Sequence, residues 1–193
     1  MPVHTIPDLA PAARRMTDLV LAVPDAMLTE PTPCPEYTVG DLVDHIGGLA
    51  VAFADAARKV GGEAAAAGDA SRLEAGWRTR MARDLRAMSD AWQDPEAWSG
   101  MTKVGGVEMP AEMIGLVGLD ELVVHGWDLA RALRQPFECD PASLEGALGF
   151  LEPMAAPEMS EQRGTVFGPV VEVADGSPLL DRVIGLSGRE PAW

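Results

Sequence analysis

Apolar residues recur every three or four positions in four long stretches of the chain, and this period predicts amphipathic helices with one buried face. The stretches cover residues 9–23, 38–53, 71–92 and 110–134. Four helices of this length, each with one apolar face, are typical of a helix bundle. We therefore predict an all-α fold built on a four-helix core.

Polar side chains and prolines mark the boundaries of these helices. Asp8 precedes the first helix, and Thr38 with Asp41 begins the second. Short polar side chains at such positions accept hydrogen bonds from the free N–H groups of the first turn. Ser71 with Glu74 gives the same signal for the third helix, and one proline opens the fourth helix while another follows its end. These signals support the four helices independently of the apolar pattern.

Shorter elements are predicted between and after the four helices. Residues 98–108 alternate around two adjacent glycines, a pattern typical of a small β-hairpin. A shorter helix is expected over 140–151, a strand over 170–173 and a terminal helical turn over 179–186. Residues 152–193 are rich in proline and glycine, which favours a tail packed around the bundle over an independent domain.

Length and composition narrow the class of protein. We expect one domain over residues 1–193, with the bundle at about 8–151 and the tail at 152–193, because the chain is too short for two ordinary enzyme domains. Hydrophobic residues make up 47% of the chain and aromatic residues only 5%, which favours packed helices over a β-sandwich. The net charge of −15 would repel phosphate backbones and anionic lipids, so neither nucleic acid nor a membrane is an expected partner. No signal-like or spanning apolar stretch occurs, which predicts a cytoplasmic protein.

The two cysteines give no sign of a disulfide framework or a thiolate metal site. Cys34 and Cys139 lie far apart in the sequence and form no CxxC pair. Cys34 stands between two prolines, where an ordinary loop residue is the expected role. We therefore place the chemistry elsewhere.

The three histidines are the first candidates for a ligand or a base. His4 lies in the terminal segment, where a solvated side chain is expected. Glu121 and His125 stand four residues apart on the fourth predicted helix, so both side chains leave one face and can converge on one ion. His45 shares a face with apolar residues of the second predicted helix and could supply a third ligand from across the bundle.

A carboxylate on the buried face of the fourth predicted helix needs compensation for its lost hydration. No lysine or arginine occurs from Pro110 to Trp127, so the simplest ion-pair partner within that helix is missing. One interpretation is a divalent metal ion held by His45, Glu121 and His125. The other is a metal-free hydrogen bond between the Glu121 and His125 side chains, with His45 as a satisfied core residue. Spacing and burial by themselves favour neither.

Three segments of the chain stand out as blocks: TPCPEYTVGDLVDHIGG around His45, ELVVHGWDLARAL around His125, and the late FGPVVEVADGSPLLDRVIGLSGR. Together they resemble actinobacterial DinB-like metal-binding proteins, which are related to the N-terminal domain of mycothiol-dependent maleylpyruvate isomerase. The resemblance implies a DinB-like four-helix bundle with a minor hairpin and a short C-terminal extension. It also implies that His45, Glu121 and His125 are the metal ligands, with water or a thiol completing the shell of a zinc ion or, as a second choice, a nickel ion.

Asp128, the last residue of the HGWD motif, lies one turn beyond His125. There it could accept a hydrogen bond from the imidazole ring and orient it, as carboxylates beside metal-binding histidines do. The alternative is an exposed carboxylate that pairs with Arg131 or Arg134 on the same helix.

The resemblance implies a metal-dependent enzyme that binds the thiol mycothiol as its thiolate and transfers or adds it to a small electrophile, as a transferase or isomerase would. The related isomerase has a substantial C-terminal domain, so we do not expect maleylpyruvate isomerisation itself. The alternative is a non-catalytic scaffold or sensor with a structural ion. Arg80, Arg83 and Arg131 are candidates to hold a carboxylate of the thiol, and a homodimer is expected from the resemblance.

Overall fold

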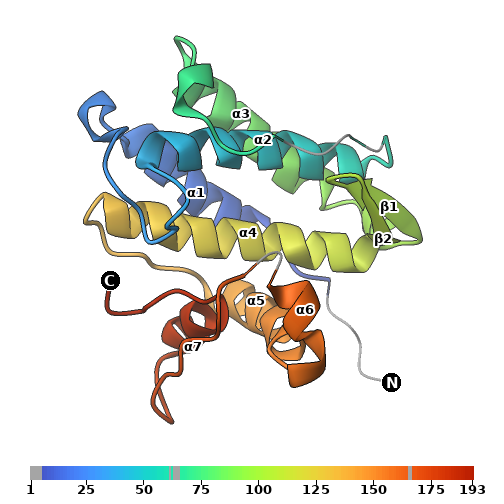
Figure 1. Cartoon of the computed structure of the whole chain (residues 1–193). Helices are drawn as coiled ribbons and strands as arrows, with labels where there is room; N and C mark the ends of the chain where they lie inside the picture. The colour runs from blue at the N-terminus through green and yellow to red at the C-terminus, as the bar shows by residue number, and fades with distance from the viewer. Residues whose placement is uncertain (1–5, 61, 63–65, 165–166) are drawn as a thin grey trace.

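The computed structural model describes residues 6–60, 62, 66–164 and 167–193, so the expectation for His4 lies outside the described residues. Its four long helices form a bundle (Figure 1). They are α1 (Ala10–Ala22), α2 (Val39–Ala57), α3 (Trp77–Ala91) and α4 (Ala111–Ala132). Around the bundle the order is α1, α3, α2, α4, because each helix packs against the next and α4 returns to α1. The predicted all-α fold with a four-helix core is confirmed.

The bundle core contains the apolar residues that the helical period marked. Its largest fully buried side chains include Phe53 from α2 and Met88 from α3. Gly118 allows α4 to approach this layer closely, since a Cβ atom there would lie 3.0 Å from the Phe53 ring and 3.2 Å from the end of Met88. Close packing of this kind fixes α4 against α2, and these are the two helices that carry the candidate ligands.

The predicted start signals of the first two helices act as expected. The Thr38 hydroxyl accepts a hydrogen bond from the Asp41 N–H at 3.3 Å, and the Asp41 carboxylate accepts one from the Thr38 N–H at 3.1 Å. Together these bonds form a capping box. The Asp8 carboxylate accepts a hydrogen bond from the Ala10 N–H at 2.9 Å, although α1 begins one residue later than predicted.

The third helix begins at Trp77, so the predicted start at Ser71 is wrong. Ser71 lies instead in a short 3-10 helix, η2 (Ala70–Arg72), where its N–H donates to the Asp69 carboxylate at 2.9 Å. Gly76 then adopts a positive φ of 79°, which interrupts a continuous helix. The capping side chain here is that of Asp69, and the short helix that it caps ends at Arg72.

The predicted hairpin is confirmed. Strands β1 (Met101–Val104) and β2 (Val107–Pro110) pair antiparallel, with Thr102 opposite Met109. Gly105 and Gly106 form the two-residue turn, with φ values of 60° and 78° that side-chain-bearing residues rarely adopt. The Thr102 hydroxyl donates to the Ala56 carbonyl at 2.6 Å and so ties the hairpin to the end of α2.

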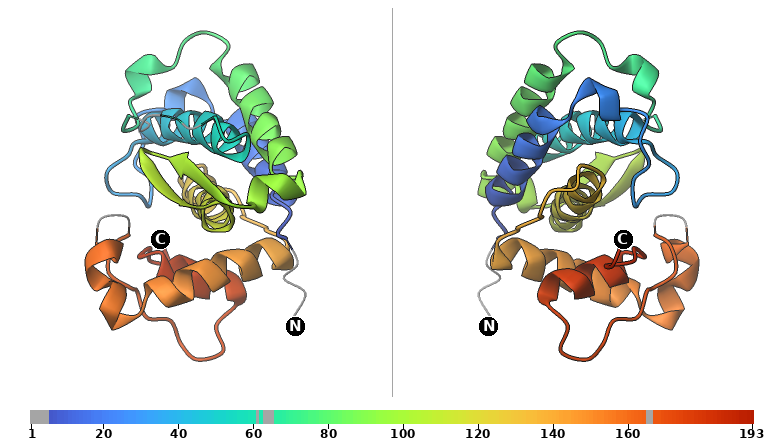
Figure 2. Two further views of the ribbon diagram at one scale, coloured as in Figure 1. Left: turned by 90° about the vertical axis from the view of Figure 1, so that its right-hand side faces the viewer. Right: turned by 90° about the vertical axis from the view of Figure 1, so that its left-hand side faces the viewer.

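The remaining helices form a second layer that lies along one side of α4 (Figure 2). They are α5 (Pro141–Met154), α6 (Ser160–Arg163) and α7 (Leu179–Leu186), and the other short 3-10 helices are η1 (Asp25–Met27), η3 (Pro95–Trp98) and η4 (Pro157–Met159). Asp140 caps α5 by accepting the Ser143 N–H at 3.0 Å. The two helices predicted in this part of the chain, α5 and α7, are confirmed.

The predicted strand at Val170–Val173 is wrong. The segment has no regular structure, and the Val171 N–H donates to the Gly185 carbonyl of α7 at 2.9 Å. β-Branched residues favour a strand only where a second strand can pair with them, and here a helix end occupies that side. Within the described residues, no helix is both long and apolar enough to span a membrane.

Candidate metal centre

His45, Glu121 and His125 converge between α2 and α4. His45 lies in the second turn of α2, while Glu121 and His125 lie one turn apart on α4. One potential ligand atom from each side chain lies within 4.8 Å of the other two. In the part of the chain that the structure describes, this is the one such group of three His, Cys, Asp or Glu side chains. The fold thus brings together the three residues that the sequence singled out.

The atoms of this cluster have contacts compatible with a shared ion. Glu121 Oε2 lies 3.0 Å from His125 Nε2, and the His45 and His125 rings meet edge to face with their centroids 5.1 Å apart. A tetrahedral zinc ion with bonds of about 2.1 Å separates neighbouring ligand atoms by about 3.4 Å. Nδ1 of His45 is buried without a hydrogen-bond partner. The donor set and spacing therefore fit a small divalent ion.

Asp128 and Arg189 hold the other side of the His125 ring. Asp128 is fully buried, and its Oδ2 atom lies 2.9 Å from Nδ1 of His125. The guanidinium of Arg189 donates to the same carboxylate at 3.1 Å and 3.4 Å. The alternative of an exposed Asp128 that pairs with Arg131 or Arg134 is therefore wrong, because the tail places Arg189 over Asp128.

Electrostatics separate the two histidines. Burial opposes a charge on His125, but hydrogen bonds with Asp128 and Glu121 outweigh it and raise the pKa to about 9. Burial and the neighbouring His125 lower the pKa of His45 to about 4. Burial also opposes the charge on Glu121, yet its hydrogen bond with His125 keeps the pKa below the ordinary value. Without an ion, the centre therefore holds a charged His125 between two carboxylates and a neutral His45.

A second buried acid, Asp120, lies beside Glu121 on α4. It is 2% exposed, and its Oδ1 atom has no hydrogen-bond partner. Burial, and then the charge of Glu121, raise the pKa of Asp120 well above its ordinary value. Asp120 therefore favours the neutral acid and adds little charge to the centre.

The interior of the bundle leaves no room for a substrate beside Glu121. The cavity on that side has a volume of about 10 Å³ and is lined by apolar side chains such as Met16, Ile46 and Leu122. This is about the space of one water molecule. Any larger ligand must therefore reach the centre from outside the bundle.

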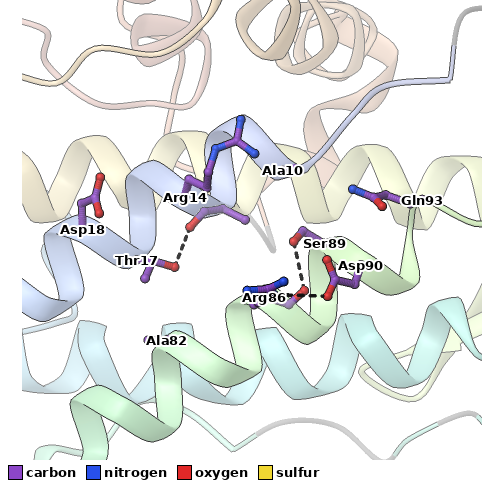
Figure 3. A pocket seen from close by; sticks show the side chains of 10 residues that line it. Ala10, Arg14, Thr17, Asp18, Ala82, Arg86, Ser89, Asp90 and Gln93 are labelled. Carbon is purple, nitrogen blue, oxygen red and sulfur yellow. Dashed lines mark hydrogen bonds and ion pairs between the residues drawn. The ribbon is translucent and has the colours of Figure 1, made fainter.

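A cavity of about 550 Å³ lies on the opposite edge of the bundle, between α1 and α3 (Figure 3). Small residues such as Ala13 and Ser89 form part of its lining. Several polar groups there already bond within their own helices, as Thr17 does with the Ala13 carbonyl at 2.8 Å and Arg86 with Asp90 at 3.5 Å. None of the three clustered side chains lines this cavity.

The basic residues suggested by the sequence lie away from the centre. Arg80 contacts Glu74 at 3.8 Å and Arg83 contacts Asp84 at 2.9 Å, both on the α3 side of the molecule. Arg131 lies over the Trp127 ring and donates to the Trp193 carbonyl. The sequence suggested them as candidates to hold a carboxylate of the thiol without placing them, and the arginine that contacts a residue of the centre is Arg189, which pairs with Asp128.

Sequence reasoning missed Arg189, Asp120 and Tyr37 as residues of the centre. The Tyr37 ring lies 5.1 Å from the His45 ring, tilted by 38°. Tyr37 and Arg189 both fall inside the sequence blocks that carry the family resemblance, and this was the available signal. Asp120 follows an apolar stretch of α4, which indicates that its side chain is buried but does not indicate which residue it contacts.

Both cysteines are expected to react slowly while the protein is folded. Burial and the nearby Asp128 charge raise the pKa of Cys34, and burial raises the pKa of Cys139 from 9.0 to about 11. Because thiolate fraction falls faster than nucleophilicity rises, we expect Cys139 to be alkylated at pH 8 at least about 10-fold more slowly than after unfolding. Mass spectrometry of iodoacetamide-treated protein, with and without denaturant, measures this ratio. Equal rates would show that Cys139 is open and ionised.

Comparisons with known proteins found a family model and two relatives in sequence. The family model described as the mycothiol maleylpyruvate isomerase N-terminal domain matches residues 9–130, which include all three clustered side chains but not Arg189. Two uncharacterized proteins of Mycobacterium tuberculosis, from strains CDC 1551 / Oshkosh and ATCC 25618 / H37Rv, are each 25% identical over 149 residues, covering 77% of this chain and 74% of the relative.

Solved structures are similar in fold. The crystal structure of the mycothiol-dependent maleylpyruvate isomerase superposes with a TM-score of 0.60 at 18% identity, covering 80% of this chain and 69% of that one. A histidine-to-alanine mutant of the isomerase gives the same TM-score and coverage at 14% identity. At these identities the likeness shows the fold, and it agrees with the DinB-like bundle expected from the sequence.

Proposed function

The chain belongs to the family of the mycothiol maleylpyruvate isomerase N-terminal domain, and on that premise we propose that it is a mycothiol-dependent enzyme with one divalent metal ion. The proposed ligands are His45, Glu121 and His125. Zinc is the first choice of ion and nickel the second, because both accept imidazole and carboxylate ligands. The proposed reaction is transfer or addition of the thiol to a small electrophile.

The observation that carries this proposal is the convergence of three ligand atoms from two helices within 4.8 Å. Two histidines and one carboxylate leave a fourth position open, as catalytic zinc sites do. The unpartnered, buried Nδ1 of His45 adds support. Such an atom costs about 1–3 kcal/mol when left unpaired, and coordination through it would remove that cost.

The charges of the surrounding residues favour an anionic fourth ligand. Asp128 and Arg189 neutralise each other at 3.1 Å, and Asp120 favours its neutral form. Glu121 then contributes the one negative charge among the ligands. A site that holds a divalent ion against a single carboxylate keeps a net charge of about +1, which attracts a thiolate more strongly than a neutral molecule.

The chain's own residues would each have a distinct task. Asp128 would accept a hydrogen bond from the Nδ1–H group of His125, which leaves the lone pair of Nε2 to bind an ion. Arg189 holds the Asp128 carboxylate in place for this task. A bound divalent ion would lower the pKa of the coordinated thiol, so that the thiolate is present near neutral pH. The apolar bundle interior beside Glu121 keeps bulk water away from that side.

Two alternative functions of the same centre differ from this proposal. A metal-free network is favoured by the 3.0 Å contact between Glu121 and His125 and by the raised pKa of His125, about 9. A non-catalytic scaffold or sensor would hold the ion without using the fourth position. The single-domain arrangement and the homodimer expected from the resemblance stay predictions.

Calorimetric titration of mycothiol into zinc-loaded and zinc-free protein tests the proposal. We expect mycothiol to bind the zinc-loaded protein at least about 10-fold more tightly, a difference of about 1.4 kcal/mol. The Arg80→Ala variant, which changes a cation on α3 away from the centre, should match the wild type. Absence of both mycothiol binding and thiol-dependent turnover in zinc-loaded protein would leave the scaffold or sensor as the surviving metal-binding function.

A further inference from the structure

Residues 68–72, here called the strap, cross α2 beside the turn that carries His45. Three successive backbone N–H groups of the strap donate hydrogen bonds to side chains on α2 or just before it. The pairs are Gly68 with Tyr37 Oη at 3.3 Å, Asp69 with Asp44 Oδ2 at 3.1 Å, and Ala70 with Asp41 Oδ1 at 2.9 Å. All three acceptors precede His45 in the sequence, so the strap is bound to the loop and the helix turn that lead into His45.

Gly68 allows the strap backbone to lie directly on α2. A Cβ atom at Gly68 would lie 2.2 Å from the Asp41 carbonyl oxygen and 3.1 Å from Cβ of His45. Real Cβ atoms do not approach backbone oxygen so closely, so any side chain at this position must push the strap away. The contact requires glycine for its close approach to the helix.

The far end of the strap is anchored by charge. The Arg72 guanidinium donates to the Asp44 carboxylate at 3.0 Å and 2.5 Å. Asp44 is the neighbour of His45 on α2, and the same carboxylate oxygen accepts the Asp69 N–H at 3.1 Å. The strap therefore fixes the backbone of α2 immediately before His45.

His45 lacks the kind of support that His125 has. The His125 ring is oriented by the hydrogen bond from Nδ1 to Asp128 at 2.9 Å, whereas Nδ1 of His45 is buried without a partner. The orientation of His45 must therefore come from packing. Its neighbours include the Tyr37 and His125 rings, each with its centroid 5.1 Å from the His45 ring, and the strap at Gly68.

We propose that the strap is a positioning element for His45, which holds the His45 imidazole toward Glu121 and His125 by fixing the α2 turn and the Tyr37 ring. The proposal rests on the proposed metal site and adds to it an element that supplies no ligand. A metal ligand that is held less firmly pays more conformational entropy on binding, so loss of the strap contact weakens the site without removing a donor.

Cobalt(II) binding to Gly68→Ala, followed through its visible absorption spectrum, tests the strap. We expect the affinity to fall roughly 10- to 100-fold, the range seen when residues supporting a metal ligand are changed, with altered band positions or intensities. Gly62→Ala is the matched control, because a Cβ atom at Gly62 meets nothing within 4 Å. That control should reproduce the wild-type affinity and spectrum.

The outcomes separate the strap from the metal site itself. Equal cobalt affinity and identical spectra for wild type and Gly68→Ala would overturn the positioning role alone. If wild type binds no cobalt, the metal site fails and the strap's role fails with it. If Gly68→Ala does not fold, Tyr37→Phe decides, because it keeps the ring beside His45 and removes only the hydroxyl that accepts the Gly68 N–H. Tyr37→Phe should weaken cobalt binding several-fold, and an unchanged affinity would count against the proposal.

Discussion

Replacing His45 with alanine is expected to weaken zinc binding roughly 100- to 1,000-fold. Structural zinc sites bind with about 10–16 kcal/mol in total, so one of four ligands accounts for roughly 3–4 kcal/mol, and each 1.4 kcal/mol is a factor of ten. Competition with a chromophoric chelator measures the affinity. Elemental analysis of protein purified without a histidine tag should show zinc in the wild type and little in the variant.

This substitution also separates the metal site from a metal-free network. His45→Ala leaves the Glu121–His125 contact at 3.0 Å and the His125–Asp128 contact at 2.9 Å in place. If the centre is a metal-free hydrogen-bond network, wild type and His45→Ala will both lack metal, and a chelator will not change the melting temperature of either. His125→Ala is the complementary variant, since it removes a ligand and leaves Glu121 without its hydrogen-bond partner, while Asp128 keeps Arg189. It should lose both zinc and stability.

Replacing Arg189 with alanine is expected to lower the free energy of unfolding by about 3–5 kcal/mol, the cost of removing one partner of a buried ion pair. Asp128 is fully buried and Arg189 is 11% exposed on its side chain, so solvent cannot replace the lost contact at 3.1 Å. For a chain of this size the melting temperature should fall by roughly 10 °C. Zinc affinity should fall roughly 10- to 100-fold as well, because Asp128 orients His125.

Two further variants control the Arg189 experiment, and calorimetry reads all of them. Arg182→Ala removes an exposed pair with Glu152, whose side chains are 44% and 54% exposed, and should change stability by at most about 1 kcal/mol. Adding Asp128→Asn to Arg189→Ala removes the unpaired charge and should recover part of the lost stability but not the zinc affinity. An Arg189→Ala variant as stable as wild type would mean that the tail does not hold Asp128 in solution.

The local features of this fold could be predicted because they depend on neighbours in the sequence. The apolar period determined four helices, and Thr38 with Asp41 placed the start of α2. Two glycines specified the hairpin turn through their φ values of 60° and 78°. The failures were also local signals, but ones that tertiary structure overruled. Ser71 lies inside the single turn of η2, which Asp69 caps, and Gly76 separates that turn from α3. The segment at 170–173 meets the end of α7 in place of a partner strand.

The contacts of the candidate site are likewise of two kinds, those that the sequence spacing predicts and those that tertiary packing decides. The spacing of Glu121 and His125 on one helix face was enough to bring them within 3.0 Å. The sequence alone left Asp128 with two possible environments, and it suggested Arg80, Arg83 and Arg131 as basic residues but not Arg189. The packing of the tail against α4 decided both matters, because it buries Asp128 and brings Arg189 to it.

By itself, then, the sequence determined the four helices, the start of α2 and the i,i+4 pair on α4, since each of these depends on bonds and side-chain directions within a few residues. Only the tertiary structure decided that His45 faces this pair, that the strap lies on α2, and that Arg189 reaches Asp128 across 61 positions of the chain. Contacts of that kind depend on how whole helices and the tail pack, which brings together residues whose spacing in the sequence carries no periodic signal.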